Sequence, residues 1–199
     1  MGGTLSLKII NPIPQIRTDD LNICTITSSD VAAITTYFQQ NREFLRPWEP
    51  RRNESFFSYE GWDRRVNQLV ELAHHKMCFY FLIRENGDPD VRGLITYSNV
   101  SMYPSYSAVV GYSMAEHAQG RGIMKKALKA TNDIIFDRLN LHRISAAFMP
   151  RNTKSQSVLE SAGFVKEGLA KEYLLINGVW EDHILMSVSN ANWYNPNIE

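Results

Sequence analysis

The residue types best suited to holding an anion lie together in one short segment, made of Gln119, Gly120, Arg121, Gly122, Ile123 and Met124. Two glycines one residue apart let the backbone turn tightly and bring its N–H groups close to a ligand. The apolar spacing that follows predicts a helix from Gly122, and a helix amino terminus presents free N–H groups and the positive end of its dipole. Such a loop favours a polyanion such as pyrophosphate, with Arg121 and Lys125 or Lys126 adding positive charge.

Two other phosphate-binding loops do not match this segment. A dinucleotide-binding fingerprint needs a third glycine where this sequence has Lys125, and it needs a βαβ unit where the sequence predicts a strand meander. A Walker loop would end in Gly-Lys-Ser or Gly-Lys-Thr, which this sequence lacks. Taken alone, the loop is also compatible with a glycine turn that has only a structural role.

A second motif follows the predicted helix, in the order Asn152-Thr153-Lys154-Ser155, Leu159, Gly163-Phe164 and Glu167-Gly168. The two motifs together resemble those of the GNAT N-acetyltransferase superfamily, in which the first binds the pyrophosphate of coenzyme A. The resemblance implies a single GNAT-like domain and acetyl-CoA as the cosubstrate.

Three further segments, 41–50, 111–113 and 173–183, resemble the ribosomal-protein-alanine N-acetyltransferases. This resemblance extends over nearly the whole chain from about Ile16. It implies an enzyme that transfers acetyl from acetyl-CoA by direct attack in a ternary complex. The acceptor it implies is the N-terminal α-amine, on alanine, of a bacterial ribosomal protein, so the expected partner is an N-terminal peptide.

The resemblance also assigns residues to the arm of the cofactor. Backbone groups of Ser113 and Met114 would hold pantetheine or the thioester carbonyl oxygen, and Asn152 and Ser155 would contact the cofactor near its sulfur. The bulky Met124 departs from the small residue that usually closes the first motif.

The general acid is less clearly marked, because many relatives carry a tyrosine at the position of Leu159. Ser155 is the nearest hydroxyl that could protonate the leaving thiolate, and cofactor contact or helix capping is its alternative role. Tyr173 is a weaker candidate for the same role, with packing in a hairpin as its alternative.

On the acceptor side, Glu49 lies in a proline-bounded segment beside Trp48. Its carboxylate could bind the substrate ammonium or accept a proton through water, or it could be a solvated loop carboxylate. Phe44 and Trp48 could line an apolar acceptor pocket or simply pack together. At pH 7, deprotonating an α-amine of pKa near 8 costs about 1.4 kcal/mol, whereas a lysine near 10.4 costs about 4.6 kcal/mol. A site with no evident strong base therefore suits an N-terminal amine better than a lysine.

Turn residues and apolar periodicity indicate the elements that must position these residues. We expect strands at 16–18, 21–26, 77–83, 94–100, 108–114, 143–148, 173–176 and 179–188. Helices are expected at 31–38, around Phe44, at 62–73, at 122–139 and at 153–162. The order predicts a mixed α/β (α+β) fold with a mostly antiparallel central sheet flanked by helices. Residues 1–15 would form a flexible arm, and 16–199 the acetyltransferase domain.

The overall composition gives no indication of a nucleic-acid or membrane partner, and only a local basic patch would change this expectation. The 21 basic and 21 acidic residues cancel, so no net charge favours nucleic acid or a membrane surface. Two distant cysteines in apolar segments suggest buried free thiols, and therefore a reducing, cytoplasmic location. No histidine has a partner at metal-binding spacing, so we expect no metal.

Two rival functions stay open from the sequence, as does the oligomeric state. One is a related acetyltransferase that acts on a small-molecule amine such as a polyamine, an amino acid or an antibiotic. The other is a non-catalytic acyl-CoA-binding or ribosome-assembly module, which Leu159 in place of tyrosine would favour.

Overall fold

The computed structural model describes residues 15–196 of the 199-residue chain, and the strands in this range form one eight-stranded sheet. The predicted arm therefore lies almost wholly outside the described residues. In the order β1-β2-β3-β4-β5-β6-β8-β7, every neighbouring pair is antiparallel except β5 and β6, which are parallel. This confirms the mixed, mostly antiparallel sheet. The strands are β1 Ile16–Arg17, β2 Leu21–Thr25, β3 Phe79–Glu85, β4 Gly93–Ser101, β5 Ser107–Met114, β6 Arg143–Phe148, β7 Val165–Ile176 and β8 Val179–Ser189.

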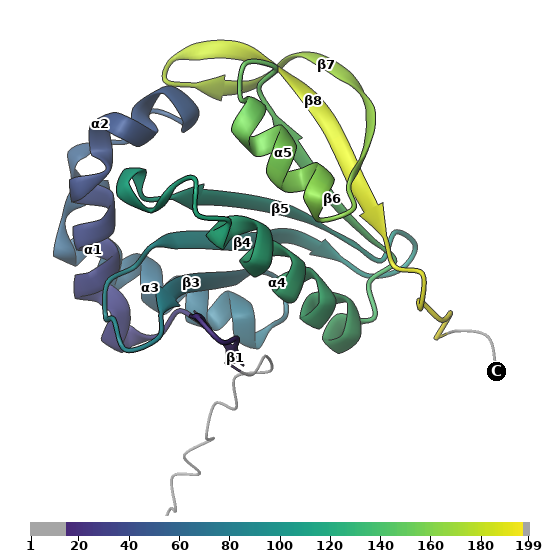
Figure 1. Ribbon diagram of the computed structural model, residues 1–199, viewed down its shortest axis with the longest axis horizontal. Coiled ribbons are helices and arrows are strands. Elements are labelled where there is room, and N and C mark those ends of the chain that lie inside the picture. Colours follow the sequence, from purple (N-terminus) through teal and green to yellow (C-terminus); the bar gives the residue numbers. More distant parts are fainter. Residues whose placement is uncertain (1–14, 197–199) are drawn as a thin grey trace, which may run out of the picture.

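Five α-helices within residues 15–196 flank this sheet, namely α1 Val31–Gln40, α2 Arg42–Leu45, α3 Tyr59–His74, α4 Ile123–Leu139 and α5 Thr153–Ser161. In Figure 1, α4 and α5 lie in front of the sheet, α3 lies behind it, and α1 and α2 stand at one end. None of the helices in the described range has the length and apolar character needed to cross a membrane.

Side-chain hydrogen bonds show which helix covers which face of the sheet. Tyr97 of β4 shares a hydrogen bond of 2.8 Å with Thr131 of α4, and Ser113 of β5 shares one of 2.9 Å with Tyr37 of α1. Tyr97 pairs with Val110 across the β4–β5 ladder, three residues from Ser113. Because successive side chains of a strand point to opposite faces, Tyr97 and Ser113 lie on opposite faces of the sheet. Helix α4 therefore packs on one face and α1 on the other.

Local sequence signals explain where several helices begin. The Thr27 N–H donates to the Asp30 carboxylate over 2.8 Å, which completes a capping box just before α1. The Ser58 hydroxyl accepts from the Gly61 N–H at the start of α3, and the Asn152 side chain accepts from the Ser155 N–H at the start of α5. These caps fix the position of the first turn of each helix.

The last hairpin is partly as predicted. Asn177 and Gly178 form its two-residue turn with φ of 46° and 89°, the left-handed pair that this turn requires. Strand β7, however, begins at Val165, earlier than the predicted start at Tyr173. The missed part is an exposed edge strand, rich in charge and interrupted by irregular register, so it shows no alternation of buried and exposed residues.

The parallel pair at the centre of the sheet is short. Only 107–109 of β5 pair with 143–145 of β6. Beyond Val109, β5 pairs with β4 alone, so the edge of β5 that faces β6 has no strand partner from Val110 to Met114 among the described residues. We call this short parallel contact the central seam. Beyond it, backbone groups of one strand are available to a ligand.

Candidate active site

The glycine loop between β5 and α4 has the backbone conformation that its sequence suggests. Gly120 and Gly122 adopt φ of 75° and 73°, a left-handed region that disfavours residues with a Cβ. Apart from the adjacent residues, no atom of residues 15–196 lies within 4 Å of the place where a Cβ would stand at either glycine. Gly122 is the N-cap of α4, and no side chain caps this helix. The start of α4 is therefore open to an external acceptor.

The backbone of this loop offers consecutive unpaired donors, which we call the N–H cradle. The first hydrogen bond of α4 runs from the Lys126 N–H to the Gly122 carbonyl, over 3.2 Å. The N–H groups of 120–125 donate to no acceptor within the described part of the chain. Donors in a row at a helix amino terminus suit the oxygens of a pyrophosphate. The cradle thus fits the anionic part of coenzyme A.

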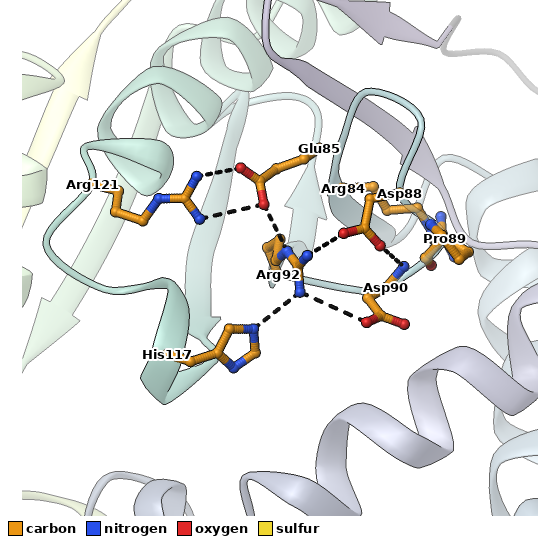
Figure 2. A network of polar contacts seen from close by, with 8 residues as sticks. All are labelled: Arg84, Glu85, Asp88, Pro89, Asp90, Arg92, His117 and Arg121. Atoms are coloured by element: carbon orange, nitrogen blue, oxygen red, sulfur yellow. Dashed lines mark hydrogen bonds and ion pairs between the residues drawn. The ribbon is translucent and has the colours of Figure 1, made fainter.

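Around the cradle, most positive side chains are already paired. Arg121 forms an ion pair with Glu85 at the end of β3, and Arg92 binds the same carboxylate at 2.9 Å (Figure 2). Hydrogen bonds from Arg121 and Arg92 hold the pKa of Glu85 below its usual range. Figure 2 also shows Arg92 reaching Asp88, Asp90 and His117. The network therefore anchors the loop to the β3–β4 connection.

The lysines predicted to assist phosphate binding differ in their surroundings. Lys126 pairs with Asp20 at 2.6 Å, whereas Lys125 has no ion-pair partner among the described residues. Lys154, at the start of α5, donates to the Gln119 side chain over 2.7 Å. This contact joins the two sequence motifs, because Gln119 opens the first and Lys154 belongs to the second.

The second motif meets β5 at a pair of hydroxyls. Ser155 Oγ lies 2.7 Å from the Tyr112 hydroxyl, which also donates to the Ser155 carbonyl over 3.1 Å. Burial raises the pKa of Tyr112. The sequence indicated Ser155 but not Tyr112, whose role depends on a contact across 43 positions in the chain. Leu159, at the position of the expected tyrosine, is 1 % exposed and part of the core.

Asn152, Met114 and Met124 complete the predicted cofactor residues. The Asn152 side-chain carbonyl caps α5 through the Ser155 N–H over 3.0 Å, so this oxygen already has a partner. Met124 is 6 % exposed and packs into the core, so its bulk is not directed out of the loop. Met114 ends β5 at the free edge beyond the central seam.

A cavity of about 460 Å³ opens beside Tyr112 and Ser113, and we call it the acceptor cavity. Its polar walls include Glu49, Arg52, Arg65, Tyr80, Tyr112 and Ser113. The volume is within the range of roughly 300–1,000 Å³ that is common for ligand pockets. Since Tyr112 also binds Ser155 of the second motif, the cavity and the cofactor motifs share a wall.

Glu49 lies in this cavity and is not a solvated loop carboxylate. Its side chain is 21 % exposed, and its nearest charged partner is Arg52 at 3.8 Å. Burial raises the pKa of Glu49, and the Arg52 charge only partly opposes this effect. The Glu49 carbonyl accepts from the Asn177 N–H over 3.0 Å, so the β7–β8 turn holds the segment in place. A buried, weakly paired carboxylate attracts a cation.

Phe44, Trp48 and Tyr173 line neither this cavity nor the neighbouring one around Arg42 and Pro50. Phe44 packs against the core, and the Arg151 guanidinium lies 5.5 Å from the centroid of the Trp48 ring. Tyr173 is 46 % exposed on β7, with its ring 5.7 Å from that of His183. The structure thus places Glu49 and Ser113 in one cavity and Ser155 against Tyr112 of its wall, and it leaves these three aromatic residues apart.

Metal ligands do not gather at this site. Within residues 15–196, no group of three or more His, Cys, Asp or Glu side chains is arranged to hold a metal ion. Both cysteines are free thiols; Cys78 is buried as predicted, whereas Cys24 is only partly buried.

Comparison with known proteins gives consistent results. Residues 20–165 match the model of the acetyltransferase (GNAT) domain family. The chain is 36 % identical over 183 residues to the [ribosomal protein uS5]-alanine N-acetyltransferase of Escherichia coli, a match that covers 91 % of this chain and 94 % of that protein. Among solved structures, the ribosomal-protein-S5-alanine acetyltransferase of Vibrio fischeri is 46 % identical with a TM-score of 0.89, covering 92 % and 100 % of the two chains. Mycobacterium smegmatis RimJ in complex with CoA-disulfide is 30 % identical with a TM-score of 0.81, covering 89 % and 86 %.

Proposed function

This chain belongs to the GNAT acetyltransferase family, and on that basis we propose that it transfers the acetyl group of acetyl-CoA to the N-terminal α-amine of a ribosomal protein, with alanine as the acceptor residue. The similarity to uS5-alanine acetyltransferases over nine-tenths of the chain supports this acceptor. A cytoplasmic location fits both the acceptor and the two free thiols.

One structural observation carries the proposal: the N–H cradle and the acceptor cavity are joined by a continuous set of contacts. Gln119 at the cradle binds Lys154 of α5. The next residue, Ser155, binds Tyr112, and Tyr112 lines the cavity that contains Glu49. A cofactor with its pyrophosphate on the cradle and its arm along the free edge of β5 would present its thioester at this cavity. The two substrates would then meet beyond the central seam.

In the proposed reaction, each residue has a separate task. Glu49 binds the acceptor ammonium and, through water, takes its proton so that the neutral amine can attack. Backbone groups of Ser113 and Met114 hold the arm of the cofactor and the carbonyl oxygen on which negative charge develops. The hydroxyl pair of Ser155 and Tyr112 supplies the proton for the departing thiolate. The pair thus acts as the general acid, a role that the hydrocarbon side chain of Leu159 cannot perform.

Replacing Ser155 with alanine is expected to lower kcat three- to tenfold, with a smaller rise in the KM for the peptide. The hydroxyl acts after the acceptor has bound, so its loss weakens the transition state more than the ground state. Steady-state kinetics on an alanine-initiated peptide measure both constants. Tyr112→Phe removes the partner hydroxyl and should give a defect of the same type. If only acetyl-CoA affinity falls in both variants, the pair binds the cofactor and has no part in proton transfer.

The charges of the acceptor cavity weigh against a polyamine acceptor. Two guanidinium groups, of Arg52 and Arg65, face one carboxylate, of Glu49. A substrate that carries only positive charge would meet an excess of like charge. A non-catalytic binding module is also disfavoured, because the cavity is lined by the Glu49 carboxylate and by Tyr112, whose hydroxyl contacts Ser155.

Intact-mass measurement after incubation with acetyl-CoA tests the proposed function. The acceptor is a short peptide that begins with alanine and contains one internal lysine. We expect the mass of a single acetyl group, located on the first residue by fragmentation. The same peptide with a blocked amino terminus should gain nothing. Acetylation of the lysine or of spermidine, with none on the amino terminus, would contradict the proposal.

A further inference from the structure

Arg65, on α3, is a cation without an anionic partner inside the acceptor cavity. It makes no ion pair or hydrogen bond with the described residues, and its guanidinium lies 4.6 Å from the centroid of the Phe56 ring and 5.1 Å from that of Trp62. Burial lowers the pKa of Arg65, and the nearby charge of Arg52 lowers it further. Cation–π contacts offset only part of the cost of removing a charge from water. An anion bound here would supply the charge partner that Arg65 lacks.

Arg52 belongs to the same positive wall. Its guanidinium lies 4.5 Å from the centroid of the Phe56 ring, and its ion pair with Glu49 spans 3.8 Å. This distance is too long for a hydrogen bond. Arg52 therefore keeps donors available while it stands beside Glu49. The wall next to the proposed ammonium site is thus positively charged.

An uncharged donor in the cavity lining also lacks an acceptor. Trp62 is 1 % exposed and lines the cavity, and its indole N–H has no partner within the described range. An unpaired buried donor is uncommon in proteins and costs free energy. Tyr80 also lines the cavity, and burial raises the pKa of its hydroxyl, as does the nearby charge of Glu49. Two guanidinium groups and an unpaired indole N–H therefore belong to a lining whose single carboxylate is that of Glu49.

We propose that the acceptor cavity recognises a carboxylate side chain near the N-terminus of the acceptor, held by Arg65 and Arg52 while Glu49 faces the α-amine. The inference rests on the proposed function and extends it from a peptide in general to an acidic N-terminal segment. Guanidinium groups bind carboxylates well because their donors match the two oxygens. Since Glu49, Arg52 and Arg65 line one cavity of about 460 Å³, the carboxylate belongs to the first few residues of the peptide. An ammonium and a carboxylate together also balance the charges on the walls.

A set of matched peptides tests this inference. Each begins with alanine and carries one glutamate at the second, third or fourth position, and each has a twin with glutamine in its place. We expect kcat/KM to be at least fivefold higher for glutamate than for glutamine at one of these positions. In Arg65→Gln, this ratio should fall to near one. The ratio is measured within one protein, so a general loss of stability or activity does not change its meaning.

Arg64 provides the matched control, because it is the preceding arginine on α3, is exposed, and does not line the cavity. Arg64→Gln should keep the glutamate preference of the unmodified protein. Equal rates on both members of every peptide pair, or an undiminished preference in Arg65→Gln, would overturn the inference and leave the proposed function intact. If acetyl-CoA binds but no alanine-initiated peptide is acetylated, the proposed function fails, and the inference fails with it.

Discussion

Valine in place of Gly122 is expected to weaken acetyl-CoA binding at least a hundredfold, which corresponds to about 2.8 kcal/mol of binding free energy. Gly122 is the N-cap of α4 at φ 73°, a conformation that a β-branched residue adopts only under strain. If the backbone relaxes to relieve that strain, the N–H groups of the cradle no longer point toward the same anion. Hydrogen bonds to a charged group contribute roughly 1.5–3 kcal/mol each, so the loss of one or two accounts for the effect.

Titration calorimetry with acetyl-CoA measures this loss. Gly87→Val is the matched control, because Gly87 lies in the β3–β4 connection at φ 81° and also has no atom within 4 Å of the place where a Cβ would stand. Both variants carry the same kind of backbone strain, and only Gly122→Val should lose the cofactor. An affinity for acetyl-CoA close to that of the unmodified protein in a folded Gly122→Val variant would show that the cofactor binds elsewhere.

Replacing Glu49 with glutamine is expected to lower peptide kcat/KM ten- to hundredfold and to leave acetyl-CoA affinity unchanged. Glutamine keeps the shape of the side chain but not the charge that attracts the acceptor ammonium. Loss of a charged hydrogen bond of roughly 1.5–3 kcal/mol gives a defect of this size. If Glu49 only attracts the amine, the defect is in KM. If it also takes the proton, kcat falls too, and that part shrinks as the pH approaches 9, where the amine is already neutral.

The pH dependence gives a second measurement on the same variant. Burial raises the pKa of Glu49, so its carboxylate becomes protonated at a higher pH than that of an exposed glutamate. Activity should therefore decline as the pH falls through this raised pKa, and Glu49→Gln should lack that decline. Full activity of Glu49→Gln at every pH would assign Glu49 a purely structural role.

The thermal stability of Glu49→Gln should not fall, in contrast to its activity. Because the folded-state pKa of Glu49 lies above the unfolded value, its ionisation disfavours folding as the pH rises through that range. A neutral glutamine avoids this cost, so the Tm of Glu49→Gln at pH 7 should not fall. Exposed Glu60→Gln serves as the control for loss of a carboxylate outside the cavity.

The sequence predicted those elements whose signals lie within a few neighbouring residues. Helix α4, strand β6 and the turn at Asn177 and Gly178 were predicted closely, because apolar spacing, glycines and turn residues act over a few positions. The cradle was predicted for the same reason, since two glycines before a helix define it. Strand β7 was predicted only in part, because an edge strand needs no buried face.

The remaining parts of the site depend on contacts between distant segments. The Ser155–Tyr112 pair joins residues 43 positions apart, and its formation depends on how α5 packs beside β5. Glu49 is half-buried, and its backbone is held by the turn at Asn177, far along the chain. Arg65 has the periodicity of an ordinary helix residue, and only the assembled cavity shows that it lacks an anion. Local sequence patterns do not show which distant residues become neighbours in the folded protein.

The short central seam also bears on the free energy of unfolding. Only three residue pairs join β5 to β6, and all strands before β5 lie on one side of them, while β8 and β7 lie on the other. In the proposed complex, coenzyme A spans this junction, from the cradle ahead of α4 to Ser155 on α5. A ligand that binds only the folded form raises the free energy of unfolding by RT ln(1 + [L]/Kd), about 2.7 kcal/mol at a hundredfold excess over Kd. The melting temperature of this protein would then follow the supply of its own cosubstrate, and depletion of acetyl-CoA would expose the chain to unfolding and proteolysis as well as halting acetyl transfer.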